Sequence, residues 1–445
     1  MKHLPKGSTK LLNAWAFYDW ANSVYSLVIA STIFPIFYGA LTIVRDKDGS
    51  ILSDTVELFG IKFNNDSLIS YVTALAFLLV AFMSPFLSGI ADYVGNKKNF
   101  LKFFCYLGAL SCIGLFWFKL EFLWFGLLCY FTALVGFWSS LVFYNSYLPD
   151  IAFPEQQDKV SAKGFSMGYI GSVILLLLCL GMVMYYRWFG FEDRDLPIRL
   201  SFVLTGLWWI GFSQITYYYL PKGNKKQTLT KDVVFNGFKE LKKIWRSLQN
   251  NTQLKKYLRA FFVYSMAVQT VMLIATYFGI EEVNWEGQDA TFGLIISILL
   301  IQLVAIAGAT ITSRLSEKLG NINTLIIVNI IWIFICIYAF FVKTPFQFYI
   351  AAGLVGLVMG GIQTLSRSTY SKMIPAGTLD TASFFSFYDV SEKIGIVIGM
   401  VLYGLVAQVF GSIRYSILFL TAFFLGGVFL LLKVPKKIEP KKEVV

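Results

Sequence analysis

The stretches "SGIADYVGNKK", residues 88–98, and "SRLSEKLGNIN", residues 313–323, are two copies of one pattern. In each copy an acidic residue follows a small residue by four positions, and a glycine and an asparagine come shortly after it. The matching residues are 225 positions apart throughout: Ser88 and Ser313, Asp92 and Glu317, Gly95 and Gly320, Asn96 and Asn321. A repeat of this kind predicts a chain built from two copies of one unit.

The repeated pattern suits a tight turn between two helices. A small residue lets the helices approach, a carboxylate can meet the positive end of a neighbouring helix or a basic side chain, and glycine adopts a backbone conformation that a β-carbon hinders. We assign a conformational loop motif to the two copies, made of Ser88, Asp92, Gly95, Lys97, Lys98, Ser313, Glu317 and Gly320.

The composition is that of a membrane protein. Of the 445 residues, 57% are hydrophobic and only 14% are charged, too few to cover one soluble core. Apolar runs of about 20 residues, the length that crosses the hydrocarbon of a bilayer, recur along the chain. We predict twelve spans: 13–44, 67–91, 100–118, 122–148, 162–186, 199–220, 257–280, 290–312, 322–342, 345–370, 382–410 and 412–433.

The net charge of +12 reflects topology in this interpretation. With the N-terminus placed inside, alternate connections hold 28 of the 38 Lys and Arg residues. This positive-inside bias puts both termini in the cytoplasm and argues against a nucleic-acid partner. Short external loops favour a bacterial inner membrane over a vacuole.

The repeat and the spans predict four parts: an N-terminal six-helix bundle at 1–220, a cytoplasmic linker at 221–256, a C-terminal six-helix bundle at 257–434, and a basic cytoplasmic tail at 435–445. The linker contains an amphipathic helix, with Val234, Phe238, Leu241, Trp245 and Leu248 on one face and Lys239, Lys242, Lys243 and Arg246 opposite. It lies on the anionic inner leaflet in one interpretation, and is a solvated tether in the other.

Cofactor and metal chemistry are not expected. All five cysteines fall inside predicted spans without a close CxxC pair, and the single histidine, His3, is in the N-terminal tail. The chain has no GxxxxGK[ST] loop, so ATP is not the expected driver.

Four further stretches carry a family resemblance: "YDWANSVYS" (18–26), "FYNSYLPDIA" with "VSAKGFSMGYIGS" (143–152 and 160–172), "GGIQTLSRS" (360–368) and "FFSFYDVSEKIG" (384–395). Together with the loop motif they look like the vacuole-effluxer branch of the major facilitator superfamily, whose bacterial members are called the unknown major facilitator family. The resemblance implies an all-α membrane protein of the major facilitator fold, with twelve transmembrane helices in two six-helix bundles that open alternately. For the eukaryotic relatives it implies amino acid efflux from the vacuole.

Few charged residues lie within spans, and each is expected to be paired or to face a water-filled cavity. Asp389 and Lys393 are four apart and share a helix face, with Glu392 on the same side, so an ion pair is expected there. Asp19 is expected to pair with Lys393 or to exchange a proton. The alternative for Asp19 is a cap of the first membrane turn, or an interfacial position on backbone amides.

Polar residues complete the expected substrate or proton-coupling set. Asn22 and Tyr25 follow Asp19 at spacings of three, and the softer candidates are Tyr144, Asn145, Gln269 and Gln363. For Arg367 we favour a snorkelling or gating position at the cytoplasmic rim over a substrate contact. Gly353, Gly356, Gly360 and Gly361 are expected to allow close helix packing.

The prediction for function is a secondary active transporter, proton-coupled, that moves a small solute, with amino acids favoured. Its partners are the solute, a proton and the bilayer, and a monomer is expected. A permease for peptidoglycan fragments, sugars or drugs, or a proton-independent uniporter, is the main alternative. A membrane enzyme acting on lipid-linked substrates is disfavoured by the lack of HExxH and GxSxG motifs. A solute-sensing receptor would need a larger effector-binding region than the tail provides.

Overall fold

Long helices running side by side make up most of the protein. The computed structural model describes residues 4–46, 51–223, 233–285, 287 and 289–436. The first half of the chain contains α1 (Thr9–Val24), the π-helix η1 (Tyr25–Ile33), α2 (Phe34–Thr42), α3 (Asn65–Val94), α4 (Lys97–Gly114), η2 (Leu115–Trp117), η3 (Leu120–Phe122), α5 (Leu123–Asn145), α6 (Leu148–Ile151), α7 (Pro154–Met184), η4 (Tyr186–Phe189) and α8 (Asp195–Tyr219). The second half contains α10 (Thr252–Glu282), α11 (Ala290–Leu319), α12 (Asn321–Phe341), α13 (Pro345–Met373), α14 (Thr381–Phe410) and α15 (Ile413–Leu432), preceded by α9 (Val233–Asn250).

The twelve predicted spans are confirmed. Among the described residues twelve helical segments are long and apolar enough to cross a membrane, and each overlaps one predicted span. The largest difference is at the fifth span, predicted from residue 162, where α7 already begins at Pro154. The extra turns carry charged side chains, so hydropathy alone does not detect them.

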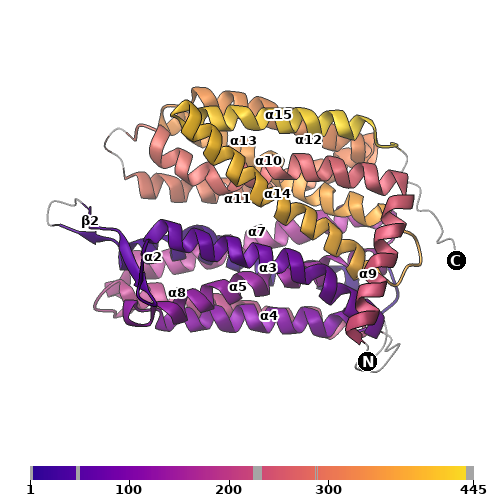
Figure 1. Ribbon diagram of the computed structural model, residues 1–445, viewed down its shortest axis with the longest axis horizontal. Coiled ribbons are helices and arrows are strands. Elements are labelled where there is room, and N and C mark those ends of the chain that lie inside the picture. Colours follow the sequence, from indigo (N-terminus) through magenta and orange to yellow (C-terminus); the bar gives the residue numbers. More distant parts are fainter. Residues whose placement is uncertain (1–3, 47–50, 224–232, 286, 288, 437–445) are drawn as a thin grey trace.

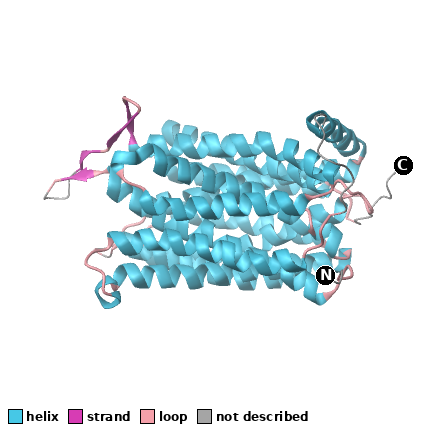
Figure 2. Ribbon diagram, turned by 90° about the horizontal axis from the view of Figure 1, so that it is seen from below, coloured by secondary structure: helices cyan, strands magenta, loops and turns pink. Residues whose placement is uncertain are grey.

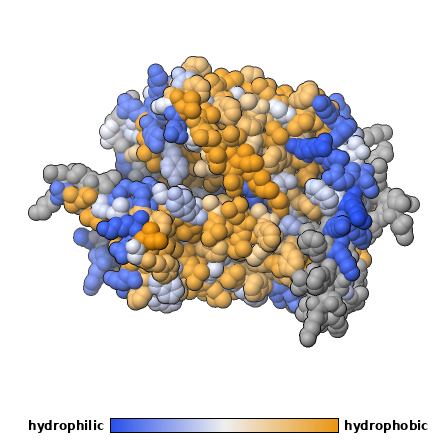
Figure 3. All heavy atoms as spheres, in the orientation of Figure 1, coloured by the Kyte–Doolittle hydropathy of each residue, from blue (hydrophilic) through white to orange (hydrophobic). Residues whose placement is uncertain are grey.

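The surface agrees with a membrane position. Figure 3 shows an apolar band across the middle of the face that it draws, with hydrophilic residues gathered at the two ends. Large apolar side chains such as Phe82, 83% exposed, lie in the spans. An apolar surface of this extent is stable in lipid and not in water.

The two halves form the two bundles of the predicted major facilitator fold (Figure 1). Within the first half α1 packs on α7 and α8, and α4 packs on α5 and α8; within the second, α11 packs on α13, and α10 and α12 pack on α15. The halves meet where α3 contacts α14 and where α7 contacts α11 and α13.

Four short strands between α2 and α3 were not predicted. They are β1 (Val44–Arg45), β2 (Ile51–Ser53), β3 (Thr55–Leu58) and β4 (Ile61–Asn64), and they form two antiparallel two-stranded sheets. Figure 2 shows them outside the helices at one end of the molecule, which we call the hairpin end. The opposite end, where α9 lies, is called the α9 end.

The linker helix α9 packs on the protein. It contacts α3, and Leu248 at its C-terminal side is 4% exposed. Trp245, predicted on the same apolar face, is 52% exposed and lies 5.6 Å from the Phe387 ring of α14. The side chains of Val234, Phe238 and Leu241 lie outside the described residues, as do 224–232 of the linker and 437–445 of the predicted tail.

The cationic face of α9 points away from the bundle. Lys239, Lys242 and Arg246 are exposed. Lys243 forms an ion pair of 3.2 Å with Asp380, directly before α14. The helix is therefore joined to the second half as well as to α3.

Two arginines repeat one contact in both halves at the hairpin end. Arg199, early in α8, donates from Nη1 to the carbonyls of Phe116 and Phe118 at 2.8 and 2.7 Å. Arg414, early in α15, donates from Nη1 to the carbonyls of Phe340 and Val342 at 2.8 and 2.5 Å. Each arginine thus satisfies carbonyls that a helix end leaves free, a second sign of the internal repeat.

Glycines bring α11 and α13 into backbone contact. A β-carbon at Gly360 would lie 2.2 Å from the Ala305 carbonyl oxygen, and one at Gly308 would lie 2.0 Å from that of Leu357. Gly356 and Gly361 are similarly close to α11, whereas a β-carbon at Gly353 meets nothing within 4 Å. The packing prediction holds for three of the four glycines.

We expect Gly360→Val to lower the free energy of unfolding by about 1–3 kcal/mol, since its side chain would force the two helices apart. The matched control is Gly353→Val on the same helix, which has open space beside it. The thermal unfolding midpoints of the detergent-solubilised variants would be compared. Equal midpoints for the two variants would contradict this packing.

Candidate functional site

A cavity of about 320 Å³ lies between the two halves. Its walls come from both halves and include eight of the eleven predicted site residues: Asp19, Asn22, Tyr25, Asn145, Gln269, Gln363, Arg367 and Glu392. The other three lie behind this wall: Tyr144 contacts Asp19, Lys393 contacts Glu392, and Asp389 pairs with Lys393. Ser31 and Thr73 line the part nearer the hairpin end.

An ion pair between the halves lies in the wall of this cavity. Oδ2 of Asp19 in α1 is 3.2 Å from both Nη1 and Nη2 of Arg367 in α13. The Tyr144 hydroxyl donates to the same oxygen at 2.9 Å. Both charged side chains are about 5% exposed or less, so each depends on the other for compensation.

The first half supplies the rest of the guanidinium's environment. Nε of Arg367 donates to Ser161 Oγ and Nη2 donates to the Ser161 carbonyl, both at 3.0 Å. Nη1 also donates to Asn145 Oδ1 at 3.3 Å. The N–H donors of a guanidinium have fixed directions because the group is planar. These acceptors therefore hold the Arg367 guanidinium in one orientation.

Close packing positions this ion pair. The guanidinium lies 4.1 Å from the ring centroid of Phe165 and 4.9 Å from that of Trp15. A β-carbon at Gly164 would lie 2.3 Å from Asp19 Oδ2. Only glycine at this position of α7 leaves room for the carboxylate.

The predicted partner of Asp19 and the snorkelling alternative for Arg367 were wrong, whereas a gating role of Arg367 stays a prediction. Asp19 pairs with Arg367 instead of Lys393. Arg367 is 3% exposed and does not snorkel, because its side chain points from α13 across to α1, α5 and α7. Asp19 is likewise not a cap of the first turn, since its described partners are side chains.

A second charged cluster, which we call the α14 triad, consists of Asp389, Glu392 and Lys393. Lys393 Nζ is 3.1 Å from Asp389 Oδ1 and 2.8 Å from Glu392 Oε2, which confirms the predicted ion pair and the neighbouring position of Glu392. Its ammonium also lies 3.5 Å from the ring centroid of Trp138 in α5.

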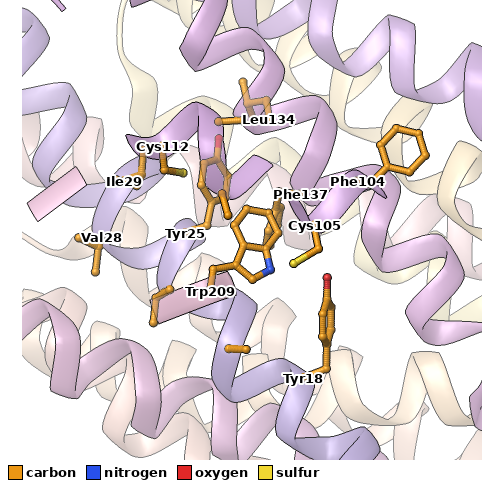
Figure 4. Close-up of a cluster of buried hydrophobic side chains, with 14 of the residues drawn as sticks. Tyr18, Tyr25, Val28, Ile29, Phe104, Cys105, Cys112, Leu134, Phe137 and Trp209 are labelled. Carbon is orange, nitrogen blue, oxygen red and sulfur yellow. The ribbon is translucent and has the colours of Figure 1, made fainter. Parts of the chain in front are cut away.

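Neutral polar groups line the remaining wall. Tyr169 donates to Gln363 Oε1 at 2.8 Å across the halves, and Gln269 Nε2 donates to Glu392 Oε1 at 2.7 Å. The buried amide nitrogen of Asn22 and the hydroxyl of Tyr25 have no hydrogen-bond partner among the described residues. Figure 4 shows Tyr25 beside Phe137 and Trp209. Unsatisfied polar groups in a cavity wall are candidates for binding a polar solute.

The first span widens where it borders the cavity. η1 is a nine-residue π-helix that begins at Tyr25, and Ser26 and Ala30 within it line the cavity. Such segments are uncommon inside helices and often occur at functional sites. The hydropathy pattern does not distinguish this segment from an α-helix.

Sequence reasoning missed four residues of the site: Trp15, Ser161, Gly164 and Phe165. The last three lie in "VSAKGFSMGYIGS", one of the stretches that carried the family resemblance. Gly164, a glycine within an apolar helix, could have indicated close approach of another group, but the sequence does not show which group approaches it.

Asp92 of the loop motif bridges the halves at the α9 end. Its carboxylate accepts hydrogen bonds from the backbone amides of Ala382 at 3.3 Å and Ser383 at 2.7 Å, at the start of α14. This confirms that the carboxylate meets the positive end of a neighbouring helix. Lys97 bonds Asp150 within the first half and donates to Thr381 Oγ1 of the second half at 2.7 Å.

The second copy of the motif works differently. Glu317 is exposed and does not take the position of Asp92. The start of α7, which it would have to meet, carries Pro154 without an N–H, and the Phe153 amide is already bonded by Gln156. The expected equivalence of the two acidic residues is therefore wrong.

Asp158 of α7 makes the corresponding contact between the halves. It accepts from Lys372 Nζ at 2.6 Å, from Asn321 Nδ2 at 2.8 Å and from Ser316 Oγ at 3.0 Å. Both aspartates thus join the halves at the α9 end. Asp92 does so where α3 meets α14, and Asp158 where α7 meets α11 and α13.

Comparisons with known proteins agree with this architecture. Residues 7–441 match the family described as vacuole effluxer Atg22 like. The chain is 30% identical to the uncharacterized MFS-type transporter YxiO of Bacillus subtilis (strain 168), covering 97% of this chain and 96% of the relative. It is 24% identical to autophagy-related protein 22 of Coccidioides immitis (strain RS), covering 93% and 84%.

Solved structures share the fold at low identity. The proton:xylose symporter XylE, bound to 6-bromo-6-deoxy-D-glucose, has a TM-score of 0.69 at 11% identity and covers 97% of both chains. The major facilitator superfamily transporter FucP in its outward conformation has a TM-score of 0.64 at 12% identity, covering 96% of this chain and 99% of that one.

Two repeated six-helix halves around a cavity with charged and amide side chains in its wall, with these relatives, define a multi-pass membrane transporter of the major facilitator type. Within that class, the chain belongs to the vacuole effluxer Atg22-like family, which matches it over nearly its full length.

We expect Asp158→Asn to separate the halves at the α9 end, because the Lys372 ammonium loses its carboxylate. Spin labels at the exposed positions Phe103 and Lys318 would report the distance between the halves. The variant should add a population at longer distance.

The control is Asp195→Asn, which removes a carboxylate from Arg199 within the first half. An unchanged distance distribution in Asp158→Asn would show that this contact does not hold the halves together.

Proposed function

We propose that the protein is a proton-coupled secondary transporter that moves small zwitterionic solutes, with amino acids as the favoured class, by alternating access. The observation that carries this proposal is the buried Asp19–Arg367 pair in the cavity wall. A buried guanidinium that faces a cavity is suited to a carboxylate ligand, which it can bind through two parallel hydrogen bonds. The description of the family as vacuole effluxers supports export of a small solute.

In this mechanism the solute carboxylate competes with Asp19 for Arg367. The two charged residues belong to opposite halves, so replacing one partner by the solute weakens a contact that joins the halves. Ser161, Tyr144 and Asn145 keep the remaining groups hydrogen-bonded during the exchange. Solute binding would thereby be linked to the opening of the α9 end.

The positive-inside bias supports a cytoplasmic position for the α9 end and both termini, in a bacterial inner membrane. The cavity then reaches toward the outer face while the α9 end is bridged by Asp92 and Asp158. Together with the bridged α9 end, this supports assigning the geometry to the outward-facing half of the proposed transport cycle.

The test is exchange of radiolabelled solute across proteoliposomes, with single amino acids, sugars and peptidoglycan fragments supplied in turn. We expect amino acids to exchange and Arg367→Gln to slow the exchange at least about tenfold, since a hydrogen bond to a charged group contributes about 1.5–3 kcal/mol. The control is Arg314→Gln, which removes an exposed arginine.

Asp19→Asn separates this proposal from a merely structural ion pair. It frees the guanidinium for the solute, so we expect tighter solute binding together with slower exchange. Exchange of sugars or peptidoglycan fragments that is indifferent to Arg367→Gln would instead support the alternative substrates. Solute exchange without any effect of a pH gradient on accumulation would support a uniporter.

A further inference from the structure

The charges of the α14 triad do not balance. Asp389 and Glu392 carry two negative charges, and Lys393 supplies one positive charge between them. Among the described residues no second cation lies within ion-pair distance of either carboxylate. The Asp19–Arg367 pair, by contrast, is neutral.

An excess negative charge is costly at this position. The side chains of Lys393, Asp389 and Glu392 are 0%, 8% and 16% exposed, so water compensates the excess charge only weakly. Charged groups in a low-dielectric site are stable only when they are paired, or when a proton neutralises them. The triad is therefore complete only with one further cation.

Glu392 is the member of the triad that such a cation can reach. It lines the cavity, while Asp389 lies behind the wall, with Ser84 of α3 donating to its Oδ2 at 3.2 Å. Gln269 of α10 orients the Glu392 carboxylate from the other side.

The surroundings of Glu392 favour an organic cation. Phe261 and Tyr388 stack with ring centroids 4.0 Å apart, and both line the cavity with it. Aromatic faces attract ammonium groups. The titratable groups around Glu392 are Asp389, Tyr388 and Lys393 on α14, Tyr264 on α10 and, across the cavity, Arg367 on α13.

We propose that Glu392 is where the ammonium group of the solute exchanges with a proton. This rests on the proposed function and adds the site and the stoichiometry of coupling. One cation neutralises the triad at a time: a proton on the Glu392 carboxylate leaves as the solute ammonium arrives, and returns when the solute departs. The transporter is then an antiporter that exchanges one solute for one proton, while Arg367 binds the carboxylate of the same solute.

Proton release on binding tests the inference directly in wild-type protein. Detergent-solubilised protein in weak buffer with a pH-sensitive dye would receive L-phenylalanine, phenylpyruvate, which lacks the ammonium, or phenethylamine, which lacks the carboxylate. We expect L-phenylalanine and phenethylamine to release up to about one proton per molecule bound. Phenylpyruvate should release none.

Glu392→Gln keeps the hydrogen bond with Gln269 but removes the exchangeable charge, so we expect it to bind without proton release. Glu392→Asp should retain the release, and Glu155→Gln, at an exposed position of α7, is the matched control. Thermal unfolding midpoints would confirm that the variants fold.

The sign of the pH dependence follows from the competition. Where Glu392 is protonated in the free protein, the apparent Kd for L-phenylalanine should rise by about tenfold for each unit that the pH falls. Binding without release at any pH, or release that persists in Glu392→Gln, would overturn the inference and leave the proposed function standing. No binding of any of the three compounds, with no amino acid exchange, would overturn both.

Discussion

The buried ion pair between Asp19 and Arg367 is the constraint on which the site depends. Its two charges come from residues 348 positions apart and from opposite halves of the protein. Neither charge is tolerated alone in an apolar interior, so the halves stay together at this point unless another ion replaces one partner. In the proposed mechanism a solute with a carboxylate meets that condition, and a solute without one does not. The proposed exchange at this pair would link selectivity to movement through one requirement of charge compensation.

The α14 triad imposes the complementary condition. The triad has a net charge of −1, so the proposal adds one cation to it. At the Asp19–Arg367 pair, by contrast, the proposal exchanges one carboxylate for another. A zwitterion carries both of the charges that the two proposals require. The cavity of about 320 Å³ has one balanced and one unbalanced cluster in and behind its walls, together with tyrosine, phenylalanine and amide side chains.

The sequence predicted the scaffold better than the site. Hydropathy located all twelve spans because each must cover the hydrocarbon of the bilayer by itself. The Asp389–Lys393 pair was also predictable, since two residues four apart on one helix meet whatever surrounds them. The partner of Asp19 was not predictable in this way. Position along α13 placed Arg367 near a membrane face, but the direction of its side chain depends on how α13 packs against α1 and α7.

The two halves repeat one another in sequence, but their structures match at the hairpin end and differ at the α9 end. At the hairpin end Arg199 and Arg414 make the same contacts with helix-end carbonyls, so the two halves share this part of their scaffold. At the α9 end the halves differ: Asp92 binds backbone amides of α14, whereas Asp158 binds Lys372. At the start of α7, Pro154 has no amide N–H and the Phe153 amide is bonded by Gln156, and the second contact between the halves is made by side chains. The features that distinguish the halves thus lie at the α9 end and in the cavity, the two places where the proposed transport cycle requires its two states to differ.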